Sequence, residues 1–406
     1  MTVQSLPARD TRIDVFRALA LLTIYINHVP GTIYEHLTHK NFGFSDAAEA
    51  FVLISGVAVG LVYGHKFQPG NRLAVTMKTL RRAFTLYVAH IMTTVATLGI
   101  FSAAAIYFAR PDLLKLINIE AIIEDTPRAL VGIATLGHQI GYNNILSVYA
   151  AILLAVPLFL FSGSISLWLT VGISGTVWLL AGIYQIAPKD YPADGYWFLN
   201  PLSWQFLFVI GMASMMHVKR GGRIAFNRWL AGAAAAYLLI AFAWVRIPLW
   251  GIDTSLGLPA VLTGFDKTFL SLTRLLHVLA LAYLIAAIPA LSNLARTRPD
   301  HPLAVLGKHS LAVFICGTLL AMIGQVAKVV TPGGLLSDTI LIAAGVALQF
   351  AFAYYLEWLS RLGSGTRRKP APATIELSVP ADAPAPGQAP MPVPVLATTR
   401  RPLDNR

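Results

Sequence analysis

Apolar runs, each close to the roughly 20 residues that a helix needs to cross a bilayer, follow one another from Ile13 to Leu359 without a hydrophilic insertion. Only helices and closed barrels satisfy their backbone hydrogen bonds in lipid, and runs of this length favour helices. Charged residues make up 12% of the chain, well below the roughly 25% of soluble domains. The sequence therefore predicts an all-α, polytopic integral membrane protein in contact with the lipid bilayer.

The runs divide the chain into a bundle of about ten transmembrane helices and a tail. They lie near residues 13–35, 47–64, 83–108, 142–161, 165–187, 201–218, 229–248, 271–291, 304–328 and 337–359. Residues 1–12 then form a short cytoplasmic lead, and residues 13–360 form one transmembrane domain. Residues 361–406 are rich in Pro and Ala and lack the apolar surface for a core, so we expect a disordered cytoplasmic tail.

The basic residues predict the orientation of these helices. The formal net charge is +12, and the cations concentrate in short loops on one side of the predicted bundle. They include Lys66, Arg72, Lys78, Arg81, Arg82, Lys219, Arg220, Arg223, Arg228, Arg296 and Arg298. Cationic loops stay in the cytoplasm, which places both termini there as well. Membrane orientation explains the positive charge, so we expect no nucleic-acid partner.

The first run carries ionisable residues at a helical spacing. Ten residues separate Arg17 from His28, so eleven steps of about 100° put both on one face, roughly 16 Å apart along the axis. Asp14 lies within about 40° of the same face. Pro30 cannot donate to the carbonyl of Ile26, so we expect the helix to kink or loosen beside His28.

Asp46 and Glu49 begin the second run, three residues apart on one helix face. Ionisable groups at membrane depth are costly, and they mark candidate functional sites. Simpler interpretations exist: Asp46 is a helix cap, and Arg17 is an anchor at a helix end. An isolated His such as His28 is more often a satisfied polar group inside a bundle.

The segment HVPGTIYEHLTHKNFGFSDAAEAFVLISG, which begins at His28, resembles the osmoregulated periplasmic glucan succinyltransferase (OpgC) family. That family is similar to the membrane acyltransferases of the acyltransferase-3 type. Their signature on the first span is Arg or Lys, ten residues and His, which Arg17 and His28 match. The similarity continues at GYWFLNPLSWQFLFVIG, DKTFLSLTRLLHVLALAYL and LGKHSLAVF.

The resemblance implies an acyltransferase of the bacterial inner membrane without a tightly bound cofactor or metal. It would move an acyl group, for which the resemblance favours succinyl, from cytoplasmic acyl-CoA to hydroxyls of a periplasmic glucan or other surface polysaccharide. His28 would be the general base that takes the proton of the hydroxyl. Glu49 is its preferred partner, with Asp46 beside it.

Four arginines are candidates for binding the acyl-CoA. Arg17 would hold the donor near its phosphates or its pantetheine arm, as the acyltransferase signature implies. Arg72, Arg81 and Arg82 are orientation charges first, but guanidinium groups also suit the phosphates of CoA.

Four residues of later runs are candidates for binding the acyl group or the acceptor. Arg274 and His277, three residues apart, would meet an acyl carboxylate or the acceptor, unless they only pair with a neighbouring carboxylate. Trp204 and Gln205 would form a wall on which a sugar stacks, although aromatic belts are the commoner reason for Trp at such depths.

Two other function classes compete with the acyltransferase. A polytopic transporter would use buried Asp, Glu and His to couple protons or ions. It would also show paired half-spans broken by Gly or Pro at corresponding places, and the sequence has no such symmetry. A haem protein would need His pairs at matched depth on facing helices. The histidines on the spans are at unmatched depths: His28, His90, His217 and His277.

Overall fold

Helices make up the regular structure of the computed structural model, which describes residues 10–192, 194–247 and 249–365. No β-strand forms within these ranges, so the predicted all-α class is confirmed. Contacts divide the chain into two units, residues 1–361 and 362–406, and only 362–365 of the second are described. Residues 1–9 of the expected lead and 366–406 of the expected disordered tail lie outside the described residues.

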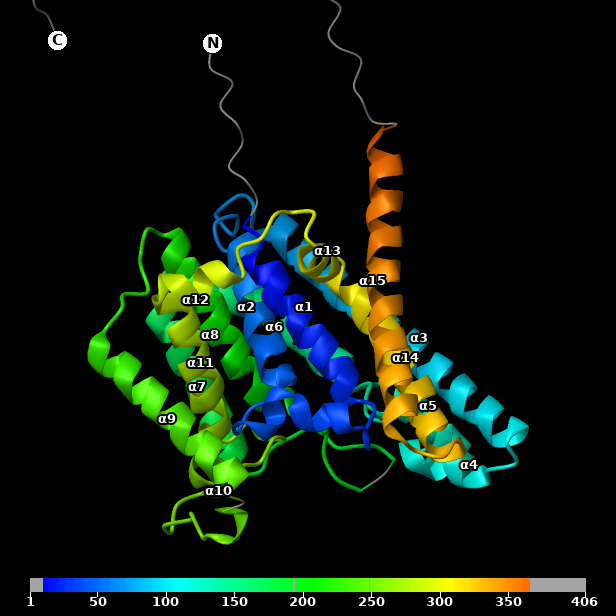
Figure 1. The fold of residues 1–406 in the computed structure, drawn as a ribbon. Coiled ribbons are helices and arrows are strands. Elements are labelled where there is room, and N and C mark those ends of the chain that lie inside the picture. Colours follow the sequence, from blue (N-terminus) through cyan, green and yellow to red (C-terminus); the bar gives the residue numbers. More distant parts are fainter. Residues whose placement is uncertain (1–9, 193, 248, 366–406) are drawn as a thin grey trace, which may run out of the picture. The chain divides into compact units, whose positions relative to one another are not determined.

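Helices of 16 residues or more occupy each of the ranges in which the sequence predicts a transmembrane helix (Figure 1). They are α1 (Arg12–Asn27), α2 (Ala47–Tyr63), α3 (Arg72–Tyr107), α6 (Asn144–Ile165), α7 (Leu167–Ile183), α8 (Pro201–Lys219), α9 (Arg228–Arg246), α11 (Leu272–Ala287), α14 (Ser310–Val330) and α15 (Leu335–Gly365). Shorter elements join them: α4 (Glu120–Glu124), α5 (Thr126–Ala134), α10 (Ala260–Thr263), α12 (Pro289–Leu294), α13 (Pro302–Lys308) and the 3₁₀ turns η1 (Ile33–Leu37), η2 (His39–Asn41), η3 (Pro111–Ile117) and η4 (Leu249–Gly251).

Several of these helices are suited to a bilayer. In the part of the chain that the structure describes, six are long and apolar enough to cross a membrane, namely α3, α6, α8, α9, α14 and α15. The helices α2, α7 and α11 are apolar but shorter. The chain is therefore a membrane protein, and the number of ten spans and the side on which the termini lie stay predictions.

The first helix ends earlier than the apolar run. α1 stops at Asn27, and His28 is its C-cap residue, whereas the run continues to residue 35. Pro30 has no N–H with which to extend the helix, and η1 and η2 then lead the chain to α2. The expected loosening beside His28 is confirmed in a stronger form, because His28 lies at the end of the helix rather than within it.

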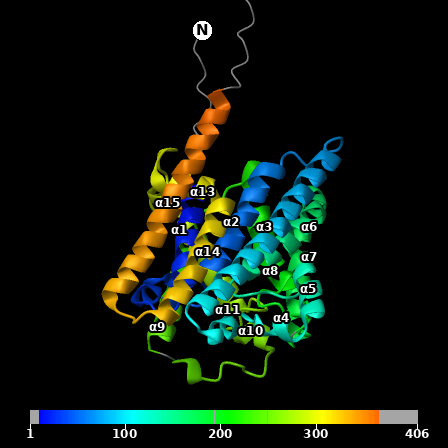
Figure 2. The same ribbon diagram turned by 90° about the vertical axis from the view of Figure 1, so that its right-hand side faces the viewer.

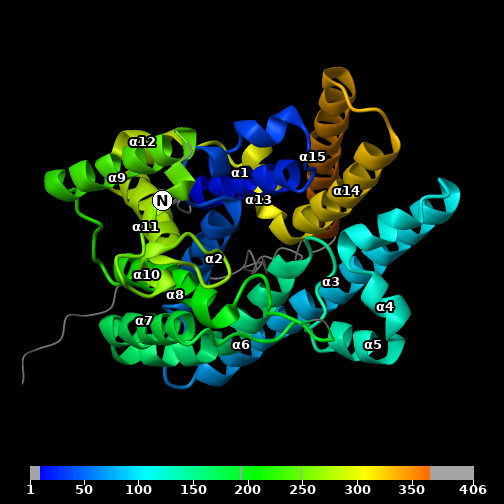
Figure 3. The same ribbon diagram turned by 90° about the horizontal axis from the view of Figure 1, so that it is seen from below.

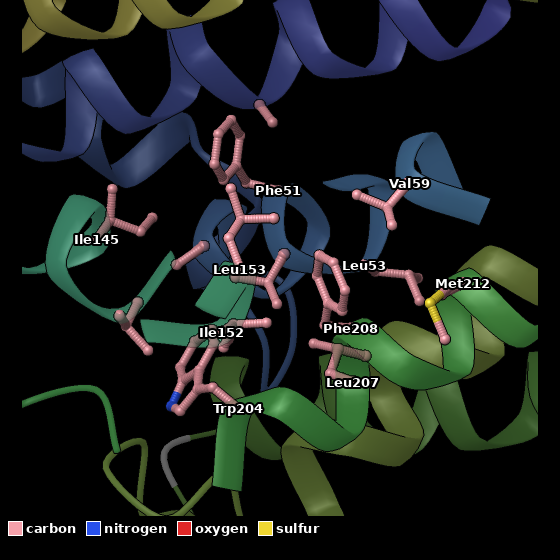
Figure 4. Close-up of a cluster of buried hydrophobic side chains, with 14 of the residues drawn as sticks. Phe51, Leu53, Val59, Ile145, Ile152, Leu153, Trp204, Leu207, Phe208 and Met212 are labelled. Atoms are coloured by element: carbon pink, nitrogen blue, oxygen red, sulfur yellow. The ribbon is translucent and has the colours of Figure 1, made fainter. Parts of the chain in front are cut away.

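α2 and α8 pack closely because glycines let their backbones meet. A Cβ at Gly56 would lie 2.0 Å from the carbonyl oxygen of Phe208, and a Cβ at Gly211 would lie 2.3 Å from that of Leu53. A side chain at either glycine would push the helices apart. Figure 4 shows part of the core around this contact, including Phe51, Val59, Ile152, Leu153, Trp204, Leu207 and Met212.

The other helices of residues 1–361 pack around this pair. α3 lies along α6, α7 lies against α8, and α9 lies against α11 (Figure 3). α1 contacts α2, α13 and α14 (Figures 1 and 2). Its contact with α13 is close, because a Cβ at Gly307 would lie 1.8 Å from the carbonyl oxygen of Asp14. These contacts fix α1, which carries Arg17 and ends at its C-cap residue, His28.

Candidate functional site

A cavity of about 300 Å³ lies among α1, α2, α3, α6, α13 and α14. Three cationic side chains line it, those of Arg17, Arg82 and Lys308. Apolar lining follows these cations along the chain: Leu86 lies one turn after Arg82 on α3, and Phe314 of α14 lies six residues after Lys308, the last residue of α13. Positive charges followed by an apolar wall suit a ligand that joins an anionic group to a less polar chain.

The arginines that the sequence singles out for acyl-CoA divide into two pairs. Arg17 and Arg82 line the cavity, as a shared binding role requires. Arg72 lies instead over two phenylalanine rings, with its guanidinium carbon 5.8 and 5.2 Å from the ring centroids. Arg81 is exposed, and neither it nor Arg72 is among the residues that line the cavity. The cavity thus brings together two of the four arginines that were predicted to bind acyl-CoA.

Cations at the cavity also have anionic neighbours. Arg17 Nη1 lies 3.5 Å from Asp14 Oδ1, one helical turn earlier. Lys308 Nζ lies 2.7 Å from Glu357 Oε2, and the same oxygen lies 3.0 Å from His309 Nε2. A bound phosphate would therefore share these cations with carboxylates of the protein.

His28 lies at the other end of α1 from Arg17, three turns along one continuous helix. Its ring stacks on Tyr142, with 4.4 Å between the centroids and 18° between the planes. Nδ1 is buried and has no hydrogen-bond partner among the described residues, while the backbone carbonyl accepts from Gln325 Nε2 at 2.7 Å. The charges of Lys267 and Asp46 lie within electrostatic reach of the ring.

Four charged residues form a cluster at the start of α2. Lys267 Nζ contacts Asp46 Oδ2, and Arg274 Nη2 lies 3.5 Å from the same oxygen. Arg274 also donates to Glu49 Oε1 from Nε and Nη2, at 2.7 and 2.6 Å. The other Glu49 oxygen accepts the backbone N–H of Asp46 at 2.9 Å, in a capping box with Asp46 at the N-cap. Two cations thus balance two carboxylates, and the interpretation of Asp46 as a cap is confirmed.

The predicted pairing of Glu49 with His28 is wrong. Glu49 is 0% exposed, and both of its oxygens are occupied, one by Arg274 and the other by the capping box. Burial of a carboxylate requires a charged partner close by, and Arg274 provides it from α11. Glu49 therefore has a structural role in the charge cluster, while His28 keeps a ring nitrogen without a partner.

The predicted sugar-binding wall is also wrong, because its residues belong to the core. Trp204 is 0% exposed and donates from Nε1 to the carbonyl oxygen of Lys267 at 3.0 Å. Gln205 donates to the carbonyl oxygen of Ser174 at 2.9 Å. The Trp204 ring packs within the hydrophobic core and does not line the cavity, so it offers no face to a sugar. Trp204 instead holds the backbone that carries Lys267 beside the charge cluster.

His277 has a comparable structural position near the cluster. It is 6% exposed, and its Nδ1 lies 2.7 Å from Ser45 Oγ, next to Asp46. Its ring also touches the backbone at Gly43, where a Cβ would lie 1.9 Å from His277 Nε2. His277 thus joins the loop before α2 to α11. Arg274, the other residue predicted on the same run, contacts Asp46 and Glu49 at the start of α2.

Three site residues were missed by sequence reasoning. Lys267 and Lys308 lie within DKTFLSLTRLLHVLALAYL and LGKHSLAVF, so their segments carried a signal even though no role was assigned to them. Tyr142 had no such signal, because a stack between residues more than 100 positions apart follows only from the packing of α6 against the rest of the bundle.

Comparison with known proteins gives a match over nearly the whole described part of the chain. A family model described as OpgC protein matches residues 9–361. That range includes Arg17, His28, the cation-lined cavity and the charge cluster. No curated protein and no solved structure matches the chain.

Proposed function

The chain belongs to the OpgC family, and on that premise we propose that it is a membrane-bound O-acyltransferase of the bacterial inner membrane. It would transfer an acyl group, for which the resemblance favours succinyl, from cytoplasmic acyl-CoA to a hydroxyl of a periplasmic glucan. The observation that carries this proposal is the position of two chemically different groups on one helix. Arg17 lies in the cation-lined cavity, and His28 lies three turns further along α1.

The cavity is the proposed site for the nucleotide end of the donor. CoA carries phosphates on its adenosine and a pantetheine arm that ends in the thioester. The cations of Arg17, Arg82 and Lys308 would bind the phosphates, and guanidinium groups do so with paired hydrogen bonds. The apolar wall beyond them would enclose the arm. The arm would then bring the thioester toward His28 while the phosphates stay at the cations.

His28 is the proposed general base. A neutral imidazole takes the proton of the acceptor hydroxyl while that oxygen attacks the thioester carbonyl carbon. The new carbon–oxygen bond forms, the carbon–sulfur bond breaks, and its electron pair leaves on sulfur. The proton then passes from the imidazolium to the thiolate, which leaves as free CoA. Two observations support this role. The stack on Tyr142 orients the ring, and Nδ1 makes no hydrogen bond to the described residues that would occupy it.

The charge cluster is the proposed site for the free carboxylate of a succinyl group. In a succinyl thioester this carboxylate lies a few bonds from the carbonyl that His28 would serve. Lys267 is the better candidate of the two cations, since its side chain is 24% exposed, against 13% for Arg274. Arg274 is already bound to Glu49 by two hydrogen bonds. We therefore assign the carboxylate to Lys267 and a supporting role to Arg274.

Mass spectrometry of periplasmic glucans tests the proposed function. Cells with the gene should carry acylated glucans, and cells without it should carry the same glucans unacylated. Wild-type protein supplied in trans should restore the modification, and the His28→Phe variant at equal abundance should not. Unchanged glucan acylation in the deletion strain would overturn the assignment of the acceptor. Restoration by His28→Phe would overturn the role of His28.

A further inference from the structure

Four polar side chains on α3, α14 and the start of α6 contain buried atoms with no hydrogen-bond partner among the described residues. These atoms are His90 Nε2, Thr94 Oγ1, Asn143 Oδ1 and Thr318 Oγ1. The first three residues are 0% exposed, and Thr318 is 2% exposed. Most buried polar groups in proteins are paired, because an unpaired group loses its hydration without compensation. We call these four residues the polar row, and their unpaired atoms point to a ligand.

The polar row lies about one helical turn beyond the lining of the cation-lined cavity, on helices that form its wall. On α3, His90 lies one turn beyond Leu86, and on α14 Thr318 lies one turn beyond Phe314. Leu86 and Phe314 both line the cavity, and residues four apart share a helix face. Asn143 precedes α6 by one residue, about one turn before the part of α6 that lines the cavity. Each of α3, α6 and α14 therefore has a buried polar residue on it or directly before it, about one helical turn further from the cations than the cavity lining.

Hydrogen bonds fix two members of the polar row, His90 and Asn143, and Asn143 is next in sequence to the residue on which His28 stacks. His90 Nδ1 lies 3.2 Å from the carbonyl oxygen of Asn143. A carbonyl only accepts, so Nδ1 donates and Nε2 of the neutral ring is left as an acceptor. Asn143 Nδ2 donates to Thr97 Oγ1 at 3.2 Å, which fixes the amide with Oδ1 unpaired. Tyr142, the preceding residue, carries the ring on which His28 stacks.

The polar row matches the hydrogen-bonding pattern of an amide chain. His90 Nε2 and Asn143 Oδ1 are acceptors, and the hydroxyls of Thr94 and Thr318 are donors. An amide has one N–H and one carbonyl, and the pantetheine arm of CoA contains two amides in series between its phosphates and its sulfur. We propose, on the basis of the function proposed above, that the polar row binds these amides and directs the thioester to His28.

Thr93 provides a matched control on the same helix. It is 1% exposed, but its hydroxyl donates to the carbonyl oxygen of Ala89 at 2.7 Å, within α3. Thr94, the next residue, makes no such bond. Valine has nearly the shape of threonine without the hydroxyl. Thr94→Val therefore removes a hydroxyl that is unpaired among the described residues, whereas Thr93→Val removes one that is already bonded within α3.

Calorimetric titration of the purified full-length protein in lipid nanodiscs tests the proposal with two probes. CoA carries the arm, and adenosine 3′,5′-bisphosphate carries phosphates without it. Thr94→Val and Thr318→Val should each weaken CoA binding about fivefold, the effect of one neutral hydrogen bond, and leave bisphosphate binding unchanged. His90→Asn should act similarly, because asparagine retains a donor for the Asn143 carbonyl but loses Nε2. Thr93→Val should change neither affinity.

Thermal unfolding without ligand separates binding from folding. Because the Thr94 hydroxyl has no partner among the described residues, Thr94→Val should unfold at the wild-type temperature or higher. Equal affinities of wild type and Thr94→Val for CoA would overturn the polar row as the arm site, and so would parallel losses with both probes. Arm-dependent CoA binding without glucan acylation would leave this inference intact and overturn the proposed reaction. A wild-type protein that binds no CoA would overturn both.

Discussion

Replacing His28 with phenylalanine removes both ring nitrogens and keeps a flat ring against Tyr142. The fold loses no hydrogen bond from Nδ1, and the backbone carbonyl that accepts from Gln325 is unchanged. The stack is retained, and an aromatic pair is worth about 0.5–1.5 kcal/mol, so we expect the free energy of unfolding to change by less than about 1 kcal/mol. The rate of transfer should fall about 10²–10⁴-fold, the usual contribution of a general base.

The assay follows the release of CoA thiol from succinyl-CoA in the presence of purified glucan and detergent-solubilised enzyme. His28→Ala is the packing control, because it also loses the stack with Tyr142 and should unfold more readily. Arg17→Gln is the binding control: it should raise the KM for succinyl-CoA with a smaller effect on kcat, because the cavity is three turns from His28.

The role of His28 as general base is refuted if His28→Phe unfolds like the wild type and transfers at more than about a tenth of its rate, since a general base contributes at least about a hundredfold. A loss confined to KM would also contradict it, because that result would move His28 from chemistry to donor binding.

Further predictions concern the charge cluster and the topology. Arg274→Met should destabilise the protein by about 3–5 kcal/mol by leaving Glu49 buried without its cation, and adding Glu49→Leu should recover most of that loss in a denaturant titration; additive losses would contradict the pairing. Lys267→Met should lower kcat/KM about tenfold or more for succinyl-CoA relative to acetyl-CoA, the effect of one lost charged hydrogen bond, whereas equal losses with both donors would assign Lys267 to structure. A periplasmic reporter should be active after residues 41, 189 and 263 and silent after 71 and 222, and activity after 222 would refute the predicted orientation.

The parts of the site that were predictable depend on local geometry along one helix. The spacing of Arg17 and His28 needs only the helical repeat: Arg17 lies on α1 and His28 caps its end, because Pro30 stops the helix earlier than the apolar run predicts. Asp46 as a cap is equally local, since a carboxylate before an apolar run accepts the free N–H groups of the first turn. The long apolar runs likewise predicted the helices themselves.

The site predictions that were wrong concern contacts between distant parts of the chain. Glu49 bonds to Arg274, 225 positions away, and nothing in the second run alone reveals that partner. Trp204 was given an exposed role because periodicity does not distinguish a membrane-interface aromatic from a core aromatic. Its burial follows from the close approach of α2 and α8, which depends on Gly56 meeting the backbone of another helix. Pairings of this kind require the assembled bundle.

The unbroken course of α1 between Arg17 and His28 makes the site sensitive to insertions and deletions more than to substitutions. One added residue between them would turn everything after it by about 100° and advance it by about 1.5 Å, which would swing the imidazole off the face of Tyr142. Four added residues would nearly restore the direction but lengthen the separation by about 6 Å, beyond the reach of a donor of fixed length. This stretch of helix can therefore vary in composition while its length is held constant.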